Sequence, residues 1–162
     1  MTAIEVLQAA DERNVLIATA ESCTGGMVAA ALTDIAGSSS VVERGFVTYA
    51  NQAKVDMLGV LQSTLDAFGA VSEEVAREMA DGAIANSRAT LAVSITGIAG
   101  PGGSEHKPEG RVCFGSAQVG KRTFTETIEF GAPGRAQVRE LARDHALSLL
   151  LKALRSKTAP SA

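Results

Sequence analysis

The stretch Ala18-Thr-Ala-Glu-Ser-Cys-Thr-Gly-Gly26 decides the fold and contains the first candidate reactive group. It continues the apolar run 15–18 and precedes 27–32, whose composition is typical of a helix. Paired glycines between a strand and a helix predict a tight turn, where unpaired backbone N–H groups favour a side-chain oxygen, an anion or a developing oxyanion. Ser22 is therefore a candidate nucleophile. Ser22 and Thr24 are also ordinary helix N-caps, so this segment alone leaves both interpretations open.

Length and composition limit the classes of protein to consider. The chain has 162 residues, 46% hydrophobic and 20% charged, which suits one domain over residues 1–162, with 158–162 as a frayed tail. A net charge of −3 argues against a nucleic-acid partner, because phosphate backbones are bound by clustered lysine and arginine. No apolar run approaches the roughly 20 residues of a membrane span, and the N-terminus lacks the layout of an export signal. We expect a cytoplasmic protein without a membrane contact.

Hydrophobic periodicity and turn residues predict alternating helices and strands. The order predicts the α/β class: a single sandwich with a mixed sheet, in which parallel βαβ units precede an antiparallel hairpin and a C-terminal helix. The predicted elements are a helix ending before Asn14, a strand over 15–20, a helix over 25–34, a strand over 41–49 with a bend or bulge at Gly45, helices over 51–58 and 72–81, a strand over 90–96, strands over 111–118 and 122–130 joined by a turn at 119–121, and a last helix with Pro133 in its first turn.

Three polar segments, 21–26, 48–54 and 96–104, each leave a predicted strand. Ligands of open α/β sheets bind just outside the carboxyl ends of strands, so we expect the site where these segments converge. A serine nucleophile needs a group that accepts its proton. The second segment offers Tyr49 and Lys54: an amine partly desolvated in a cleft has a lowered pKa, and a nearby phenol can relay a proton. From the segment alone, an exposed, solvated lysine is the simpler interpretation.

Other candidate groups are weaker. His106 lies in a polar loop and His145 on an apolar helical stripe, so a Ser/His/Asp arrangement is not favoured. Cys23 competes with Ser22, because a thiolate at a helix N-terminus is activated whereas a thiol turned into the sheet is inert. Cys23 and Cys113 form no disulfide framework, and no Cys/His spacing matches a zinc site, so no metal is expected.

The glycine-rich loop 96–104 exposes consecutive backbone N–H groups, a shape suited to a phosphate. It is not a Walker A loop, since no Gly-Lys-Ser/Thr follows, and Pro101 interrupts the dinucleotide-binding spacing. An anionic, phosphate-bearing ligand is one interpretation and a plain flexible turn is the other.

Taken together, the chain resembles the C-terminal domain family of the competence/damage-inducible protein CinA, whose stand-alone members are nicotinamide-nucleotide amidohydrolases. The resemblance extends over nearly the whole chain in the family's order. Glu109 and Arg111 depart from the family pattern, and Phe130-Gly-Ala-Pro-Gly-Arg135 lacks the usual acid before the arginine. The matching motifs are Thr19-Ala-Glu-Ser-Cys-Thr-Gly-Gly26, Ala36-Gly-Ser-Ser39, Gly45-Phe-Val-Thr-Tyr49 with Asn51 and Lys54, Leu58-Gly-Val60, Gly69-Ala-Val-Ser-Glu73, Thr96-Gly-Ile-Ala-Gly-Pro-Gly-Gly103 and Lys107-Pro108.

The resemblance implies a three-layer α/β/α fold, a homodimer or higher homo-oligomer, and deamidation of nicotinamide mononucleotide to nicotinate mononucleotide and ammonia without a cofactor or metal. Ser22 matches the family's nucleophile, Lys54 its base and Tyr49 its proton-relay partner. We expect the backbone of Cys23, Thr24 and Gly25 to bind the oxyanion. The expected substrate-binding residues are Glu21, Asn51, Thr96, Gly97, Gly100, Gly102, Gly103, Lys107 and Arg135.

Two alternatives remain open at this point. The first keeps the amide hydrolysis but makes Cys23 the nucleophile. The second is a non-catalytic nucleotide-binding module, or an interaction module linked to competence or DNA damage, because some family members are domains of longer chains.

Overall fold

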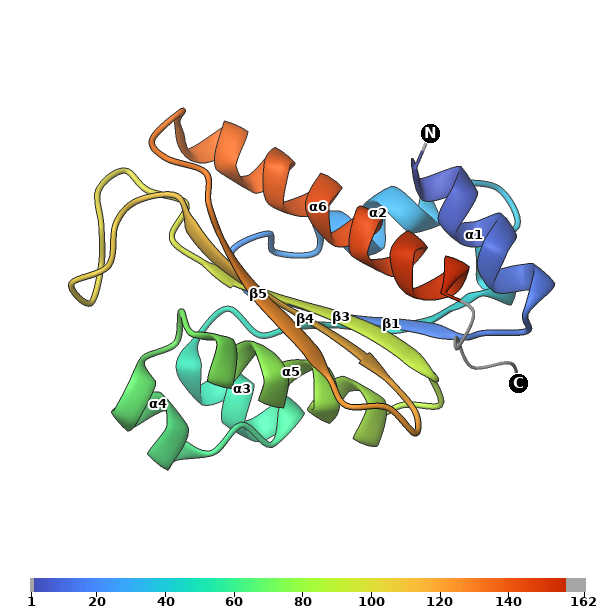
Figure 1. The fold of residues 1–162 in the computed structure, drawn as a ribbon, viewed down its shortest axis with the longest axis horizontal. Helices are drawn as coiled ribbons and strands as arrows, with labels where there is room; N and C mark the ends of the chain where they lie inside the picture. Colours follow the sequence, from blue (N-terminus) through green and yellow to red (C-terminus); the bar gives the residue numbers. More distant parts are fainter. Residues whose placement is uncertain (1, 157–162) are drawn as a thin grey trace.

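The computed structural model describes residues 2–156; the expected frayed tail, 158–162, lies outside the described residues. Its centre is a five-stranded sheet in the order β2-β1-β3-β4-β5 (Figure 1). β1 pairs in parallel with β2 and β3, whereas β4 and β5 continue the sheet in antiparallel fashion. The predicted α/β class is confirmed, with a mixed sheet whose antiparallel hairpin comes last. The strands are β1 (Ile17–Glu21), β2 (Val42–Val47), β3 (Leu91–Gly97), β4 (Arg111–Gln118) and β5 (Phe124–Glu129).

Helices cover both faces of the sheet, which gives the three layers that the resemblance implies (Figure 1). α1, α2 and α6 lie on one face; α3 and α5 lie on the other, where α4 packs beside α5. Within residues 2–156 no helix is both long enough and apolar enough to cross a bilayer. The helices are α1 (Thr2–Glu12), α2 (Met27–Thr33), α3 (Asn51–Leu58), α4 (Gln62–Phe68), α5 (Glu73–Ala85) and α6 (Arg135–Arg155), with a short 3₁₀ helix η1 (Ser38–Ser40).

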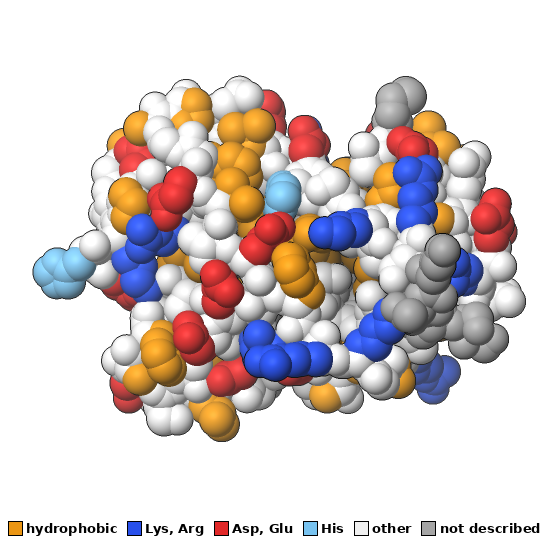
Figure 2. All heavy atoms as spheres, in the orientation of Figure 1, with side chains coloured by type: hydrophobic (Ala, Val, Ile, Leu, Met, Phe, Trp, Pro, Cys, Tyr) orange, Lys and Arg blue, Asp and Glu red, His pale blue; other side chains and the backbone are white. Residues whose placement is uncertain are grey.

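The core lies on both sides of the central strands. Every residue of β1 is buried, because helices cover both of its faces; such a strand is apolar without alternation. One apolar cluster, which includes Leu32 and Leu150, fills the space under α1, α2 and α6. A second, which includes Leu58 and Met79, lies under α3 and α5. The central strands are thus held between two packed layers, and their carboxyl ends are fixed in space. On the surface in Figure 2, acidic and basic side chains are interspersed.

Several element boundaries differ from the predictions. α2 begins at Met27, so residues 22–26 form a separate turn. α6 begins at Arg135, so Pro133 precedes the helix and does not lie in its first turn. α5 extends to Ala85, and α4 was not predicted at all. With seven residues and only Leu65 buried, α4 is too short to show a helical period.

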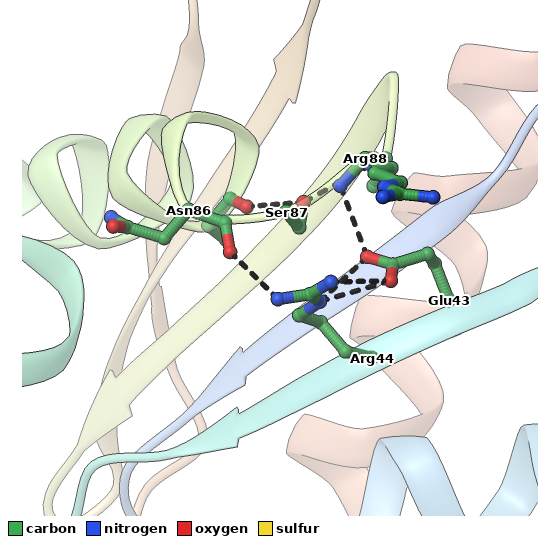
Figure 3. A network of polar contacts seen from close by, with 7 residues as sticks. Glu43, Arg44, Asn86, Ser87 and Arg88 are labelled. Carbon is green, nitrogen blue, oxygen red and sulfur yellow. Dashed lines mark hydrogen bonds and ion pairs between the residues drawn. The ribbon is translucent and has the colours of Figure 1, made fainter.

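The predicted bend or bulge is present in β2, at Glu43 and two residues before Gly45. The register against β1 skips Glu43, whose carboxylate accepts hydrogen bonds from Arg44 and from the Arg88 N–H (Figure 3). Arg44 also donates to the Asn86 carbonyl at 3.2 Å, so this network ties the edge strand to the connection between α5 and β3. Gly45 has a different role: a Cβ there would lie 2.8 Å from the Thr19 hydroxyl.

Candidate active site

The three polar segments converge at the carboxyl ends of β1, β2 and β3, around a cavity of about 350 Å³. Eleven of the predicted site residues line this cavity, whereas Glu21, Thr24, Gly25 and Lys107 do not. Sequence reasoning missed Ala70, Val71 and Glu105, since nothing in the local sequence links 70–71 to this edge. The predicted residues at the cavity are Ser22, Cys23, Tyr49, Asn51, Lys54, Thr96, Gly97, Gly100, Gly102, Gly103 and Arg135.

The first helical N–H groups of α2 are capped by Glu21, which contradicts the N-cap interpretation of Ser22 and Thr24. The Glu21 carboxylate is fully buried and accepts from the Val28 N–H at 2.9 Å and the Ala29 N–H at 3.1 Å. It also accepts from the Thr24 hydroxyl at 2.6 Å. The N-cap position is Gly26, which has no side chain to offer. Ser22 therefore does not cap the helix, and its hydroxyl is left for another partner.

That partner is Lys54, from the first turn of α3. Its Nζ lies 3.1 Å from the Ser22 Oγ, although Lys54 follows Ser22 by 32 positions in the chain. The Lys54 side chain is 1% exposed, so the solvated-lysine interpretation is wrong here. Nζ also donates to the Thr48 carbonyl at 3.1 Å and the Tyr49 carbonyl at 3.2 Å. Nζ also lies 3.5 Å from Asn51 Oδ1, and the Ser22 hydroxyl lies 3.5 Å from the Tyr49 carbonyl. In its neutral form the amine has two N–H groups, which can donate to the Thr48 and Tyr49 carbonyls, and its lone pair can then accept from the Ser22 hydroxyl.

Burial lowers the pKa of Lys54, because desolvation disfavours the ammonium form. The negative charge of Glu105 opposes this shift, as would that of a Cys23 thiolate, but both effects are smaller than the effect of burial. Among the described residues no carboxylate forms an ion pair with Lys54. The amine is therefore biased towards the form that can accept a proton.

The N–H groups of the turn are not equivalent. Gly25 donates to the Ser22 carbonyl at 3.0 Å, which closes the turn. For the N–H groups of Cys23 and Thr24, residues 2–156 provide no acceptor on another residue. Arg139 of α6 donates to the carbonyls of these two residues. Of the predicted oxyanion donors, the Thr24 amide thus has no acceptor within residues 2–156, the Cys23 amide contacts only its own thiol, and the Gly25 amide is engaged.

Tyr49 contributes its backbone and its phenol to different contacts. Its carbonyl accepts from Lys54, while its side chain is 62% exposed. The phenol oxygen accepts from Arg135 Nη2 at 3.2 Å, and Arg135 Nη1 donates to the Gly100 carbonyl at 2.6 Å. Arg135 therefore joins the Tyr49 ring to the glycine-rich loop at the mouth of the cavity. The structure brings the Tyr49 carbonyl, and not the phenol, to the Ser22–Lys54 pair.

The glycine-rich loop is braced by side chains that sequence reasoning assigned to the ligand or left unexplained. Lys107 Nζ donates to the Phe68 and Val71 carbonyls at 2.6 Å each. Glu109, one of the departures from the family pattern, accepts from the Gly102 N–H at 2.5 Å. The Thr96 hydroxyl donates to the Ala70 carbonyl at 2.8 Å. These contacts hold the loop in one shape.

Cys23 and the histidines have no place in a nucleophilic pair. Burial raises the pKa of Cys23 to about 11, so it is a protonated thiol at neutral pH. His145 contacts Glu126 and the Phe114 ring, and His106 is exposed. Among residues 2–156, no group of three or more His, Cys, Asp or Glu side chains is placed to hold a metal ion.

Comparisons with known proteins show which family this chain resembles. A family model described as the CinA C-terminal domain matches residues 2–154. The nicotinamide-nucleotide amidohydrolase PncC of Escherichia coli K12 is 52% identical over 147 residues, which are 90% of this chain and 88% of that protein. A CinA-like protein of Chloroherpeton thalassium is 51% identical over 146 residues, but this chain spans only 34% of its length.

Solved structures show the same fold. The competence/damage inducible protein CihA from Agrobacterium tumefaciens has a TM-score of 0.91 and 47% identity, with 96% of this chain and 94% of that chain covered. A competence-damaged protein (CinA) superfamily protein from Escherichia coli has a TM-score of 0.88 and 37% identity, over 94% and 90% of the two chains.

Proposed function

Because the chain belongs to the CinA C-terminal domain family, we propose that it hydrolyses the carboxamide of nicotinamide mononucleotide to give nicotinate mononucleotide and ammonia. The observation that carries this proposal is the buried amine of Lys54, 3.1 Å from the Ser22 hydroxyl. Relatives that match this chain over most of their own length carry the name nicotinamide-nucleotide amidohydrolase.

In the acylation step, the Ser22 Oγ attacks the carboxamide carbon while Lys54 Nζ accepts the hydroxyl proton. The C–O bond forms and the carbonyl π pair moves onto oxygen, where the amides of Cys23 and Thr24 stabilise the charge. Collapse of this intermediate breaks the C–N bond. Lys54 returns the proton to the departing nitrogen, so ammonia leaves and a Ser22 ester remains.

In the second step, Lys54 accepts a proton from water, and the resulting hydroxide attacks the ester carbon. The Ser22 Oγ leaves and recovers this proton from Lys54, and the new carboxylic acid releases its own proton to solvent and departs as a carboxylate. Each step uses Lys54 alternately as base and acid, which requires an amine with a pKa well below its ordinary value. Tyr49 serves at the mouth of the cavity, where its phenol can receive or release protons through solvent.

The ribosyl phosphate binds between Arg135 and the glycine-rich loop. Arg135 uses two of its donors on Tyr49 and Gly100 and has others to offer an anion. Within the described part of the chain, the N–H groups of Gly100 and Gly103 have no acceptor. Asn51, Thr96 and Gly97 line the wall between this end and the Ser22–Lys54 pair. Glu21 and Lys107 act indirectly, by holding the turn and the loop.

The decisive test is ammonia release from nicotinamide mononucleotide by the purified chain and by Ser22→Ala. We expect the substitution to lower kcat/KM by about 10³-fold or more, because it removes the nucleophile. Ser148→Ala, an exposed serine of α6, is the matched control and should have the wild-type rate. Full activity of Ser22→Ala would overturn the mechanism, and no release by the wild type would overturn the function.

A non-catalytic role in a longer assembly is the second candidate, and it is supported by one finding. The chain corresponds to about a third of several longer relatives, one of them named as a putative competence-damage inducible protein. Binding of nicotinamide mononucleotide without ammonia release, with Ser22 and Lys54 intact, would favour this role.

We further propose a cytoplasmic homodimer, or higher homo-oligomer, that binds no nucleic acid. Val47 and Tyr49, at the edge strand β2, are 49% and 62% exposed and would be partly covered by a second copy. The mixed surface charge and the net charge of −3 argue against a phosphate-backbone footprint. Light scattering after size-exclusion chromatography tests the oligomer: a monomer at micromolar concentration would contradict it.

A further inference from the structure

Arg139 lies on α6, one helical turn beyond Arg135, yet it contacts the turn that carries Ser22. Its Nε donates to the Cys23 carbonyl at 3.0 Å and its Nη2 donates to the Thr24 carbonyl at 3.3 Å. Along the chain, Arg139 follows Cys23 by 116 positions and Thr24 by 115 positions. A guanidinium with two donors on successive carbonyls fixes the orientation of both peptide groups.

Each peptide group consists of the carbonyl of one residue and the N–H of the next, so these two groups carry the N–H groups of Thr24 and Gly25. In a trans peptide the C=O and the N–H point in opposite directions, so a carbonyl held by Arg139 directs the N–H on its other side. The Gly25 N–H closes the turn onto the Ser22 carbonyl, and the Thr24 N–H has no acceptor in residues 2–156. Arg139 therefore holds an unoccupied donor next to the nucleophile. A charged donor on the carbonyl also polarises the amide and strengthens its N–H as a donor.

The charge of Arg139 has no local counter-ion. Among the described residues no carboxylate lies within ion-pair distance of it, whereas Arg143, the next turn along α6, pairs with Asp144. The Arg139 side chain is half-buried, so its guanidinium acts through a medium less polar than water.

We propose that Arg139 is a positioning residue for the oxyanion-binding turn: it holds the Cys23 and Thr24 carbonyls so that the Thr24 N–H meets the negative oxygen that forms when Ser22 attacks. This inference rests on the proposed function for its substrate. It assigns to Arg139 an effect on the transition state and none on the binding of the ground-state nucleotide.

The test compares Arg139→Met and Arg139→Lys with Arg143→Met, a control on the same helix. We expect Arg139→Met to lower kcat for ammonia release about 10- to 100-fold with KM changed less than about 2-fold, since one oriented donor is lost. Arg139→Lys keeps the charge but loses the contact with two carbonyls, so its kcat should lie between those of the wild type and Arg139→Met. Added guanidinium ion at millimolar concentration should restore part of the kcat of Arg139→Met and leave Arg143→Met unchanged.

A second readout separates this inference from the proposed substrate. A fluorophosphonate that phosphonylates Ser22 also generates a negative oxygen, so its labelling rate should fall in Arg139→Met and recover with guanidinium, even if the wild type releases no ammonia. The proposal would be overturned if Arg139→Met had the same labelling rate and the same kcat as the wild type. A rise in the KM of Arg139→Met at constant kcat would also overturn it. A loss of kcat that guanidinium does not rescue, in a variant that unfolds at lower urea, would also overturn it in favour of a purely structural role.

Discussion

Lys54 places an amine in the interior with no carboxylate partner in residues 2–156, and the proposed chemistry depends on this residue. Its two neighbouring carbonyls satisfy the N–H groups of the neutral form, whereas an ammonium at the same position loses its hydration. Activity should therefore rise with pH through the lowered pKa of Lys54 and level off above it, in a profile of kcat against pH.

The same burial makes a prediction about stability. At pH values below the lowered pKa, Lys54 is protonated in both states, and folding buries an ammonium. Between that pKa and the ordinary value the unfolded chain binds more protons, so the stability of the wild type rises with pH. Lys54→Met removes the titrating amine, so its urea unfolding should lack the rise in stability between pH 7 and pH 10 that we expect of the wild type. The loss of the donors to the Thr48 and Tyr49 carbonyls should lower the stability of this variant at every pH. Lys54→Met should also lower kcat by about 10²-fold or more. Lys152→Met, at an exposed site on α6, is the control and should show none of these effects.

Cys23 provides a prediction that separates the two nucleophile hypotheses. Because its pKa is raised to about 11, the thiol contributes packing and not reactivity. Cys23→Ala should retain kcat within about 3-fold, since in the proposed mechanism Cys23 acts only through its backbone N–H, at a stability cost of about 1 kcal/mol for the lost sulfur. Loss of ammonia release in a folded Cys23→Ala would favour a cysteine mechanism.

At the scale of elements, α2 depends on a cap that comes from the preceding strand. Glu21, the last residue of β1, accepts three hydrogen bonds, two of them from the start of α2. Glu21→Gln turns one acceptor into a donor that faces an N–H, so unfolding in urea should show a loss of about 1–3 kcal/mol. The turn should also shift and lower kcat. Glu12→Gln, at the exposed end of α1, should change stability by less than about 0.5 kcal/mol.

The edge strand β5 is held to α5 by polar contacts. Glu73 accepts from the Thr125 and Thr127 hydroxyls, and Arg77 donates to the Thr123 carbonyl. This pairing explains why β5 lacks the apolar alternation of an inner strand. α4 is likewise supported from a distance, by Glu78 of α5, which accepts from the Leu61 N–H at 2.8 Å. Contacts of this kind have no local sequence pattern.

At the scale of the whole molecule, the packing of α3 on α5 sets where Lys54 lies. A Cβ on Gly82 of α5 would lie 1.9 Å from the Leu58 carbonyl at the end of α3. Gly82→Ala should therefore cost about 1–3 kcal/mol in urea unfolding although alanine favours helices, and it should lower kcat because α3 moves. Ala85→Gly, at the exposed end of α5, is the control: it should cost about 1 kcal/mol at most and leave kcat unchanged. If Gly82→Ala had the stability and the kcat of the wild type, the close packing of α3 on α5 would be contradicted.

The order of the strands explains how distant residues reach one edge. The parallel strands β1, β2 and β3 end side by side, which brings Ser22, Lys54 and the glycine-rich loop together. The antiparallel pair β4 and β5 then returns the chain to the first helix layer, where α6 carries Arg135 and Arg139 to the same place (Figure 1).

The sequence by itself determined the α/β class, the existence and order of the strands, and three segments of the cavity, because hydrophobic period, β-branched runs and glycines act over a few neighbouring residues. It also singled out Ser22 and Lys54 as reactive groups. Only the tertiary structure decided that Glu21 caps α2, that the Lys54 amine is buried, that Lys107 and Glu109 brace the loop, and that Arg139 holds the turn. These depend on contacts between residues far apart in the chain, and a long-range contact leaves no periodic trace in a single sequence.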